Sequence, residues 1–241
     1  MKYKITIEYD GTSYLGWSNS IDKAIEKAIQ ELTKENIKIY GAGRTDAGVH
    51  ALGQTAHFVL QNYFEPNKLM NSLNYFLRAS NETIILIDCK IVDDEFHARF
   101  SAIKRYYKYL ILNRPQSSVI LKNKVLHVHK KIDIDSMQKC LPLLIGKNDW
   151  SSFRGSNCQS KSPIKTVDKV ELKKNEDIII FTMEAKSFLY HQVRNTIGTL
   201  LNVGLGKRSI DDFENIILSK DRTKAGKTAD ACGLYLEKID Y

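Results

Sequence analysis

The chain is 241 residues long, with 43% hydrophobic and 27% charged residues, a formal net charge of +8 and a pI of about 9.1. These values describe a soluble globule of one large or two small domains, and the positive charge favours a polyanionic partner unless it only reflects a Lys-rich proteome. Four widely spaced cysteines without a Cys-x-x-Cys pair argue against a zinc site, and no apolar run is long enough to span a bilayer, so we expect a cytoplasmic protein without a bound metal.

Apolar periodicity predicts a succession of strands and helices. Ile5, Ile7 and Tyr9 alternate as in a strand with one buried face, and residues 21–32 repeat at helical spacing with Ser20 as the expected N-cap. Further strands are predicted at residues 37–40, 54–59, 83–92, 104–112, 166–173, 178–185 and 234–239. Further helices are predicted from Pro66 and at residues 133–144, 190–203 and 210–218.

Several of the predicted strands follow one another directly. This order favours an α+β fold with a mixed or antiparallel sheet. No flexible linker divides the chain, and we place a boundary near residue 104. It separates an N-terminal half, residues 1–103, from a C-terminal half, residues 104–241, and the two halves have a similar order of elements without a sequence repeat.

The most informative segment is residues 41–50, GAGRTDAGVH. Three glycines in eight residues allow positive φ and close backbone approach, which a shaped loop needs. The segment lacks the Lys and Ser or Thr of a phosphate-binding loop, and Asp46 stands where a dinucleotide fingerprint needs glycine. The loop either presents Arg44 and Asp46 to a ligand or is a tight turn in which Asp46 caps a helix and Arg44 is solvated. Spacing alone does not separate these two interpretations.

This loop, continued by Gly53-Gln54 and His57-Phe58, resembles the active-site motif of the tRNA pseudouridine synthase A family. Other blocks that resemble the family follow in the family's order along nearly the whole chain. They are Glu8-Tyr9-Asp10-Gly11 with Gly16-Trp17, residues 96–102 (FHARFSA) with 105–109 (RYYKY), residues 149–154 (DWSSFR) with 158–160 (CQS), residues 191–195 (HQVRN), and residues 233–236 (GLYL) with Asp240-Tyr241.

The resemblance implies a pseudouridine synthase fold, in which two ferredoxin-like halves share a mostly antiparallel central sheet with an active-site cleft between them. It implies an isomerase, an intramolecular transferase, that converts uridine to pseudouridine at positions thirty-eight, thirty-nine and forty of the tRNA anticodon stem-loop. It also implies that the enzyme works as a homodimer. The reaction breaks the C1′–N1 bond, rotates the uracil and joins C1′ to C5, so neither a cofactor nor a metal is expected.

The resemblance also assigns roles to individual residues. Asp46 is the catalytic carboxylate, either as a nucleophile at C1′ or as a general base at the 2′ position. Arg194 is the cation that keeps Asp46 ionised, although its helix position also fits an exposed arginine or one paired with another carboxylate. Tyr107 stacks on the target uracil, and Leu234 packs under it. Arg44 fills the gap that the flipped base leaves in the RNA, or it only contacts a phosphate.

Basic and aromatic residues are interleaved on the predicted strand that carries Tyr107. Alternation places Tyr107 and Tyr109 on one face, and one of the two is expected in the core. Lys104, Arg105 and Lys108 are expected to contact RNA phosphates, with a solvated face as the alternative. A second basic cluster near the C-terminus has the same two interpretations, and it comprises Lys220, Arg222, Lys224 and Lys227.

One departure from the family pattern follows Trp17, where only Ser18-Asn19-Ser20 precede the first helix. The family usually has a longer Gln- and Arg-containing segment there, so the affinity for RNA and the range of modified uridines stay open. Two other function classes fit the sequence less well. A non-catalytic tRNA-binding or tRNA-folding protein would not need a desolvated carboxylate beside RNA, and an RNA methyltransferase would need a glycine-rich cofactor turn that this chain lacks.

Overall fold

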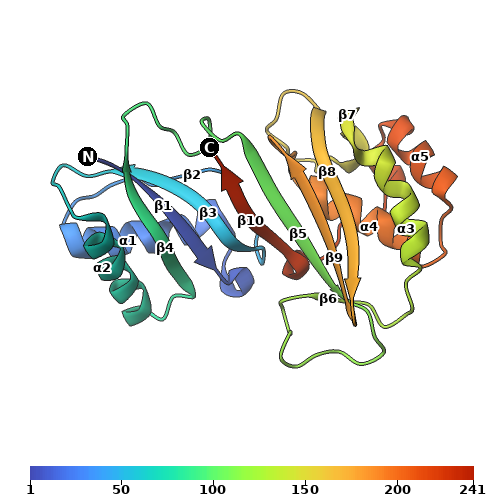
Figure 1. Cartoon of the computed structure of the whole chain (residues 1–241), viewed down its shortest axis with the longest axis horizontal. Coiled ribbons are helices and arrows are strands. Elements are labelled where there is room, and N and C mark those ends of the chain that lie inside the picture. The colour runs from blue at the N-terminus through green and yellow to red at the C-terminus, as the bar shows by residue number, and fades with distance from the viewer. The chain divides into compact units, whose positions relative to one another are not determined.

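The computed structural model describes residues 1–241, and the chain divides into two compact units (Figure 1). Unit 1 comprises Met1–Ile103 together with Tyr235–Tyr241, and unit 2 comprises Lys104–Leu234. The sequence placed residues 104–241 in one half. In the structure the last strand returns to unit 1, because Tyr235 and Leu236 pair with a strand near residue 50.

Unit 1 is built on a mostly antiparallel sheet. Its strands in spatial order are β4 (Ile84–Val92), β1 (Lys2–Tyr9), β3 (His50–Val59) and β10 (Leu234–Asp240), and the short β2 (Tyr40–Gly41) also pairs with β3. β1 is antiparallel to both of its neighbours, and Ile5 lies opposite Ala56 and Cys89. β10 is parallel to β3, with Tyr235 opposite His50.

Helices α1 (Ile21–Thr33) and α2 (Pro66–Ala79) cover one face of this sheet (Figure 1). α1 buries Ile21, Ile25 and Ile29, a spacing of four residues that places all three on one helix face. In α2, Pro66 occupies the first helical position, and the Glu65 carboxylate accepts hydrogen bonds from the first backbone N–H groups.

Unit 2 carries the remaining strands and helices. Its strands in spatial order are β5 (Lys104–Leu112), β9 (Ile178–Ala185), β8 (Ile164–Asn175) and β7 (Gly146–Asp149), and β6 (Leu126–His127) pairs in parallel with β5. Its helices are α3 (Ile134–Cys140), α4 (Gln192–Gly204) and α5 (Ile210–Ser219). α4 is buried along most of its surface, whereas α5 is amphipathic and begins with a capping box between Ser209 and Asp212. The predicted α+β class with a mostly antiparallel sheet is confirmed.

Several predicted elements are shorter than expected, each for a local reason. Of residues 37–40, only Tyr40 pairs with β3, so the strand has no partner before that point. The helix predicted at 133–144 ends at Cys140 and continues as a 3-10 turn that contains Pro142, which has no N–H to donate. The helix predicted from residue 190 begins at Gln192, because His191 has a left-handed φ of 61°.

Ser20 precedes α1 as predicted, but its hydroxyl does not cap the helix. It donates instead to the Gly16 carbonyl at 3.0 Å and accepts the Leu15 N–H at 2.9 Å. These bonds close the short turn after Trp17, so the serine holds this turn and not the helix end. None of the helices of the protein combines the length and apolar character needed to cross a membrane.

Candidate active site

The Asp46 loop is attached to strand β3 by hydrogen bonds along its first half. The Ala42 N–H donates to the Thr55 carbonyl at 2.8 Å, and the Gln54 side-chain amide donates to the Gly43 carbonyl at 2.8 Å. The loop then turns back at Gly48, whose φ is +77°. β3 is the inner strand between β1 and β10, so the loop starts from a rigid element.

The N-terminal turn of unit 1 holds the second half of this loop. The Trp17 N–H donates to the Thr45 carbonyl at 3.1 Å, and the Gly48 N–H donates to the Tyr14 carbonyl at 3.3 Å. The hydroxyls of Tyr9 and Thr45 share a buried hydrogen bond of 2.8 Å. Both sides of position 46 are therefore fixed by residues that lie about thirty positions earlier in the chain.

Glycines make this close approach possible. A Cβ on Gly16 would lie 2.5 Å from the Thr45 carbonyl oxygen, and a Cβ on Gly11 would lie 2.0 Å from the Val49 carbonyl oxygen. Gly16 also has a φ of +95°, which L-residues rarely adopt. The blocks around Gly11 and Gly16 thus shape the Asp46 loop by backbone contact, a role that the sequence analysis did not assign to them.

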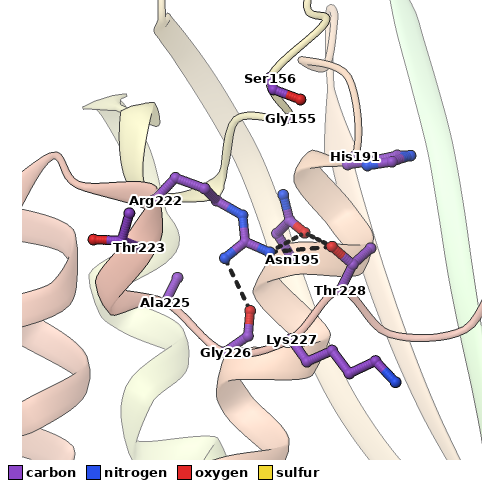
Figure 2. A pocket seen from close by; sticks show the side chains of 10 residues that line it. All are labelled: Gly155, Ser156, His191, Asn195, Arg222, Thr223, Ala225, Gly226, Lys227 and Thr228. Atoms are coloured by element: carbon purple, nitrogen blue, oxygen red, sulfur yellow. Dashed lines mark hydrogen bonds between the residues drawn. The ribbon is translucent and has the colours of Figure 1, made fainter.

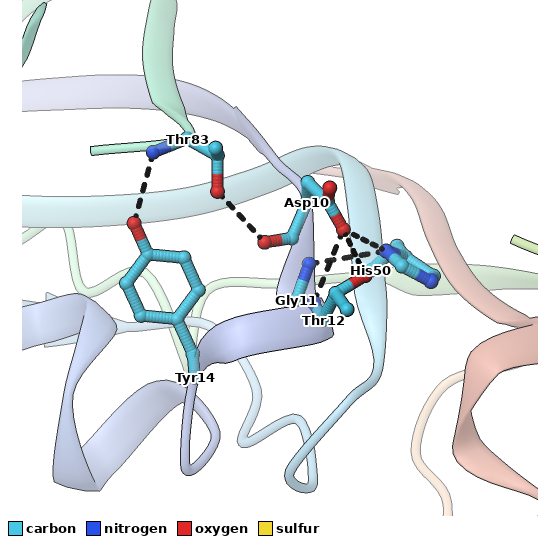
Figure 3. A network of polar contacts seen from close by, with 6 residues as sticks. All are labelled: Asp10, Gly11, Thr12, Tyr14, His50 and Thr83. Carbon is cyan, nitrogen blue, oxygen red and sulfur yellow. Dashed lines mark hydrogen bonds and ion pairs between the residues drawn. The ribbon is translucent and has the colours of Figure 1, made fainter. Parts of the chain in front are cut away.

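A polar network lies at the base of the loop (Figure 3). The His50 Nδ1 accepts the Gly11 N–H at 3.0 Å, and an Asp10 carboxylate oxygen lies 3.1 Å from the same nitrogen. That oxygen also accepts the Thr12 N–H and hydroxyl. One nitrogen cannot accept from Gly11 and donate to Asp10 at once, so the two contacts belong to different protonation states of His50 Nδ1. His50 further stacks on Tyr235, with 4.7 Å between ring centroids.

Tyr14 links this network to the start of β4 (Figure 3). Its hydroxyl donates to the Glu82 carboxylate at 2.6 Å and accepts the Thr83 N–H at 3.0 Å. Burial, together with the hydrogen bond to Glu82, raises the pKa of Tyr14 to about 12. The phenol stays protonated at neutral pH. Its two hydrogen bonds hold Tyr14 in place, and the Tyr14 carbonyl accepts the Gly48 N–H.

In unit 2, strand β5 carries the two tyrosines that alternation placed on one face. Tyr109 is fully buried, and its hydroxyl donates to the Asp230 carbonyl at 2.7 Å. Burial, with contributions from Cys232 and Asp230, raises the pKa of Tyr109. Tyr107 is only partly buried and meets Phe188 edge-on, with 5.1 Å between ring centroids. Tyr109 is therefore the core residue of the pair.

Arg194 lies in the first turn of α4 and is held by the segment before β10. Its Nε donates to the Ala229 carbonyl at 2.8 Å, and the Ala229 N–H donates to the Arg194 carbonyl at 3.1 Å. The same segment passes Gly233, where an added Cβ would lie 2.6 Å from the Tyr109 ring, and it ends at buried Leu234. One stretch of chain thus connects Arg194 with Leu234.

Comparison with known proteins decides the family. A family model described as tRNA pseudouridine synthase matches residues 5–101 and 141–241. Two curated relatives, both named tRNA pseudouridine synthase A, cover all of this chain and all of their own length: one from Ehrlichia ruminantium (strain Gardel) is 44% identical, and one from Anaplasma phagocytophilum (strain HZ) is 43% identical. The chain belongs to the tRNA pseudouridine synthase A family. A crystal structure of a Cbf5-Nop10-Gar1 complex has a TM-score of 0.40 and 12% identity over 84% of this chain and 45% of that chain.

The residues that the family resemblance singled out fall into two groups. Arg44 and Asp46 lie in one loop of unit 1, with Arg44 exposed and Asp46 partly buried. Tyr107, Arg194 and Leu234 lie in unit 2, on β5, on α4 and at the start of β10, and Arg194 is bonded to the segment that leads to Leu234. The roles given to these residues remain predictions.

The predicted RNA-contacting residues of β5 have partners within the protein. The Lys104 ammonium lies 3.3 Å from Asp168 and 3.6 Å from Glu184, and the hydrogen bond to Asp168 raises the pKa of Lys104. Arg105 is 8% exposed and donates to the Lys186 carbonyl. Lys108 is partly buried. RNA contact by Lys104 or Arg105 would have to compete with these partners.

Gln54 is a residue of this region that the sequence analysis quoted but gave no role. Its side chain is fully buried, its amide nitrogen supports Gly43, and its Oε1 has no hydrogen-bond partner. The sequence signal for this role was a glutamine within a run of buried strand positions, because a buried side-chain amide normally has a hydrogen-bond partner. No group of three His, Cys, Asp or Glu side chains is placed to hold a metal ion.

Proposed function

We propose that this protein isomerises uridine to pseudouridine in tRNA, at positions thirty-eight to forty of the anticodon stem-loop. The observation that carries the proposal is the fixed loop around Asp46 in a chain of this family: the backbone on both sides of the carboxylate is held by hydrogen bonds to β3 and to the N-terminal turn. A carboxylate held in one place is what a reaction without a cofactor requires of its enzyme.

The chemistry balances within the substrate. The C1′–N1 bond breaks, the uracil rotates, and C1′ bonds to C5, whose proton is lost while N1 gains one. Asp46 either attacks C1′ and carries the sugar as an ester until C5 returns, or it removes the 2′ proton and the sugar passes through a glycal. In both cases the carboxylate must be ionised when the uridine arrives, and it must be regenerated when pseudouridine leaves.

The other residues of the site have supporting roles in this proposal. The Arg194 guanidinium, oriented by its bond to Ala229, is the cation that favours an ionised Asp46. Tyr107 supports the uracil ring, and Leu234 packs under it. Arg44, which is exposed on the Asp46 loop, occupies the space that the flipped uridine leaves in the RNA stem. The proposed working form is a cytoplasmic homodimer that binds tRNA.

The test is release of tritium from tRNA transcribed with uridine labelled at C5. We expect release with the wild-type protein and none with Asp46→Asn, while both bind tRNA with affinities within about threefold, because the substitution removes a charge but keeps the shape of the side chain. Glu8→Gln is the matched control, since it removes a carboxylate from the same unit outside the loop.

Tight binding of tRNA by the wild-type protein without any release would favour the alternative function, a non-catalytic tRNA-binding or tRNA-folding protein. Loss of binding in Asp46→Asn would show that the residue is structural. Mapping the pseudouridines in the product separates positions thirty-eight to forty from any other target.

A further inference from the structure

Unit 2 contains a polar pocket beside the first turns of α4, and none of the side chains assigned to the active site lines it (Figure 2). The pocket has a volume of ≈ 410 Å³, which lies within the range of pockets that hold small ligands. Ser156, His191, Asn195, Arg222 and Thr228 contribute side chains to it. No acidic residue lines the pocket, so its charge comes from basic groups alone.

The four basic residues that the sequence grouped near the C-terminus have different environments. Lys220 lies 3.8 Å from the Asp149 carboxylate. Lys224 is exposed and does not line the pocket, whereas Arg222 and Lys227 do. The Lys227 side chain extends away from the Arg222 guanidinium (Figure 2), which leaves Arg222 as the cation inside the pocket.

The Arg222 guanidinium is held rigidly by neutral groups. It donates to the Gly226 carbonyl at 3.0 Å, to the Asn195 Oδ1 at 3.0 Å and to the Thr228 hydroxyl at 3.1 Å (Figure 2). Asn195 is oriented for this contact, because its amide nitrogen donates to the Phe153 carbonyl at 2.8 Å. Three bonds leave two of the five guanidinium N–H groups for another acceptor.

Arg222 is a partly buried cation without an acidic partner. Burial lowers its pKa, and no carboxylate acts in the opposite direction. Removing a cation from water is unfavourable unless an opposite charge compensates for it, and a guanidinium fork matches the oxygens of a phosphate. The Ser156 hydroxyl and the His191 imidazole are further polar groups at the same pocket.

We propose that this pocket binds a phosphate group of the tRNA backbone, with Arg222 as its principal ligand. The proposal rests on the proposed function for the identity of the RNA. A phosphodiester bound here fixes the register of the RNA on unit 2 without reading its sequence, as phosphate contacts do in general. The Asn195 and Thr228 bonds orient the guanidinium before the RNA arrives, so less side-chain entropy is lost on binding.

A purely structural role for Arg222 must be distinguished from phosphate binding. The segment that Arg222 fastens to α4 continues to Ala229, whose carbonyl orients Arg194. Gly226 and Gly198 pack backbone against backbone in the same place. Loosening this segment would change catalysis through Arg194, but it would not change the number of phosphates that the protein neutralises.

The experiment is the salt dependence of tRNA binding by the full chain between 50 and 200 mM KCl. Arg222→Gln is expected to weaken binding by about tenfold and to lower the slope of log K against log salt by about one, because one phosphate contact is lost. Arg222→Lys keeps the charge and is expected to keep the slope. Lys224→Gln is the matched control, since it removes an equal charge two positions away. It is expected to change the affinity by less than about twofold and to leave the slope unchanged.

The proposal is overturned if Arg222→Gln keeps the wild-type slope, or if Lys224→Gln lowers it equally. A lower kcat for Arg222→Gln at saturating tRNA with an unchanged slope would mean that Arg222 only positions Arg194. A second experiment measures whether free inorganic phosphate stabilises the wild-type protein against unfolding. If it does, and Arg222→Gln still keeps the wild-type slope for tRNA, the pocket binds a free anion and the RNA contact is refuted. If the wild-type protein neither binds tRNA nor releases tritium, the proposed function itself fails, a result distinct from the failure of this pocket.

Discussion

Gly16→Ala tests how far the N-terminal turn controls the position of the Asp46 loop. The new Cβ would lie 2.5 Å from the Thr45 carbonyl oxygen, whereas real Cβ contacts need 3.0–3.4 Å, so the loop or the turn must move by about 0.5–0.9 Å. Thr45 directly precedes Asp46, the proposed catalytic residue, and a displacement of about 1 Å at a catalytic group costs on the order of 100-fold in rate. We therefore expect kcat for tritium release to fall by about 10- to 100-fold.

The substitution also destabilises the protein, and a second glycine separates the two effects. Alanine at a φ of +95° costs about 1–3 kcal/mol of backbone strain, and crowding against Thr45 adds about 1–3 kcal/mol. Gly146 has nearly the same φ, +92°, but nothing lies within 4 Å of its added Cβ. Gly146→Ala is therefore expected to lower the free energy of unfolding by the strain alone and to leave kcat within about twofold of wild type.

The measurements are urea unfolding and tritium release at saturating tRNA, both at a temperature at which each variant is more than nine-tenths folded. If position 16 acts through its contact with the Asp46 loop, only Gly16→Ala and not Gly146→Ala loses activity. Wild-type kcat in Gly16→Ala, or equal losses of kcat in Gly16→Ala and Gly146→Ala, would refute the argument that this turn positions Asp46.

Three further predictions concern other contacts. Burial, with smaller effects of His97 and Lys2, lowers the pKa of His57 to about 4. The unfolded state therefore binds more protons between about pH 6.5 and 4, and the free energy of unfolding should fall by about 1–3 kcal/mol as the pH falls through that window. A His57→Asn variant with the same pH dependence would contradict this assignment. Tyr9→Phe and Thr45→Val should each destabilise by about 1 kcal/mol, and the double variant by less than the sum of the two; strict additivity would show that their hydroxyls are not coupled. Arg194→Ala should lower kcat by at least about tenfold with tRNA binding less affected, because an ionised Asp46 is then less favoured, and full activity would remove Arg194 from the site.

Local patterns in the sequence were sufficient for most of the elements. β5 has the predicted bounds, residues 104–112, and α1 ends one residue beyond the predicted span, because apolar residues at a period of two or 3.6 need only a buried face to form a strand or a helix. The predictions failed where a backbone feature or a missing partner overruled the local pattern, as at the left-handed His191 before α4 and at residues 37–39, which do not pair with β3.

Part of the candidate site could be predicted from local sequence patterns, and part depends on contacts between distant segments. The glycines around Asp46 indicated a shaped loop, and the resemblance to the family motif, not the spacing, pointed to Arg44 and Asp46. Its support could not, because the Tyr9–Thr45 bond joins residues 36 positions apart and the Arg194–Ala229 bond joins residues 35 positions apart. Nothing in a local pattern indicates which distant polar groups will meet.

The sequence by itself determined the α+β class, the family and the loop that presents Arg44 and Asp46, because these follow from short-range spacing and from motifs read in order. Only the tertiary structure decided that Tyr109 and not Tyr107 is the core residue, and that Arg222 is held in a pocket while Lys224 is solvated. The physical reason is that burial and hydrogen-bond partners are properties of the packed chain. Residues with the same chemistry and similar spacing acquire different environments only when segments far apart in sequence close around them.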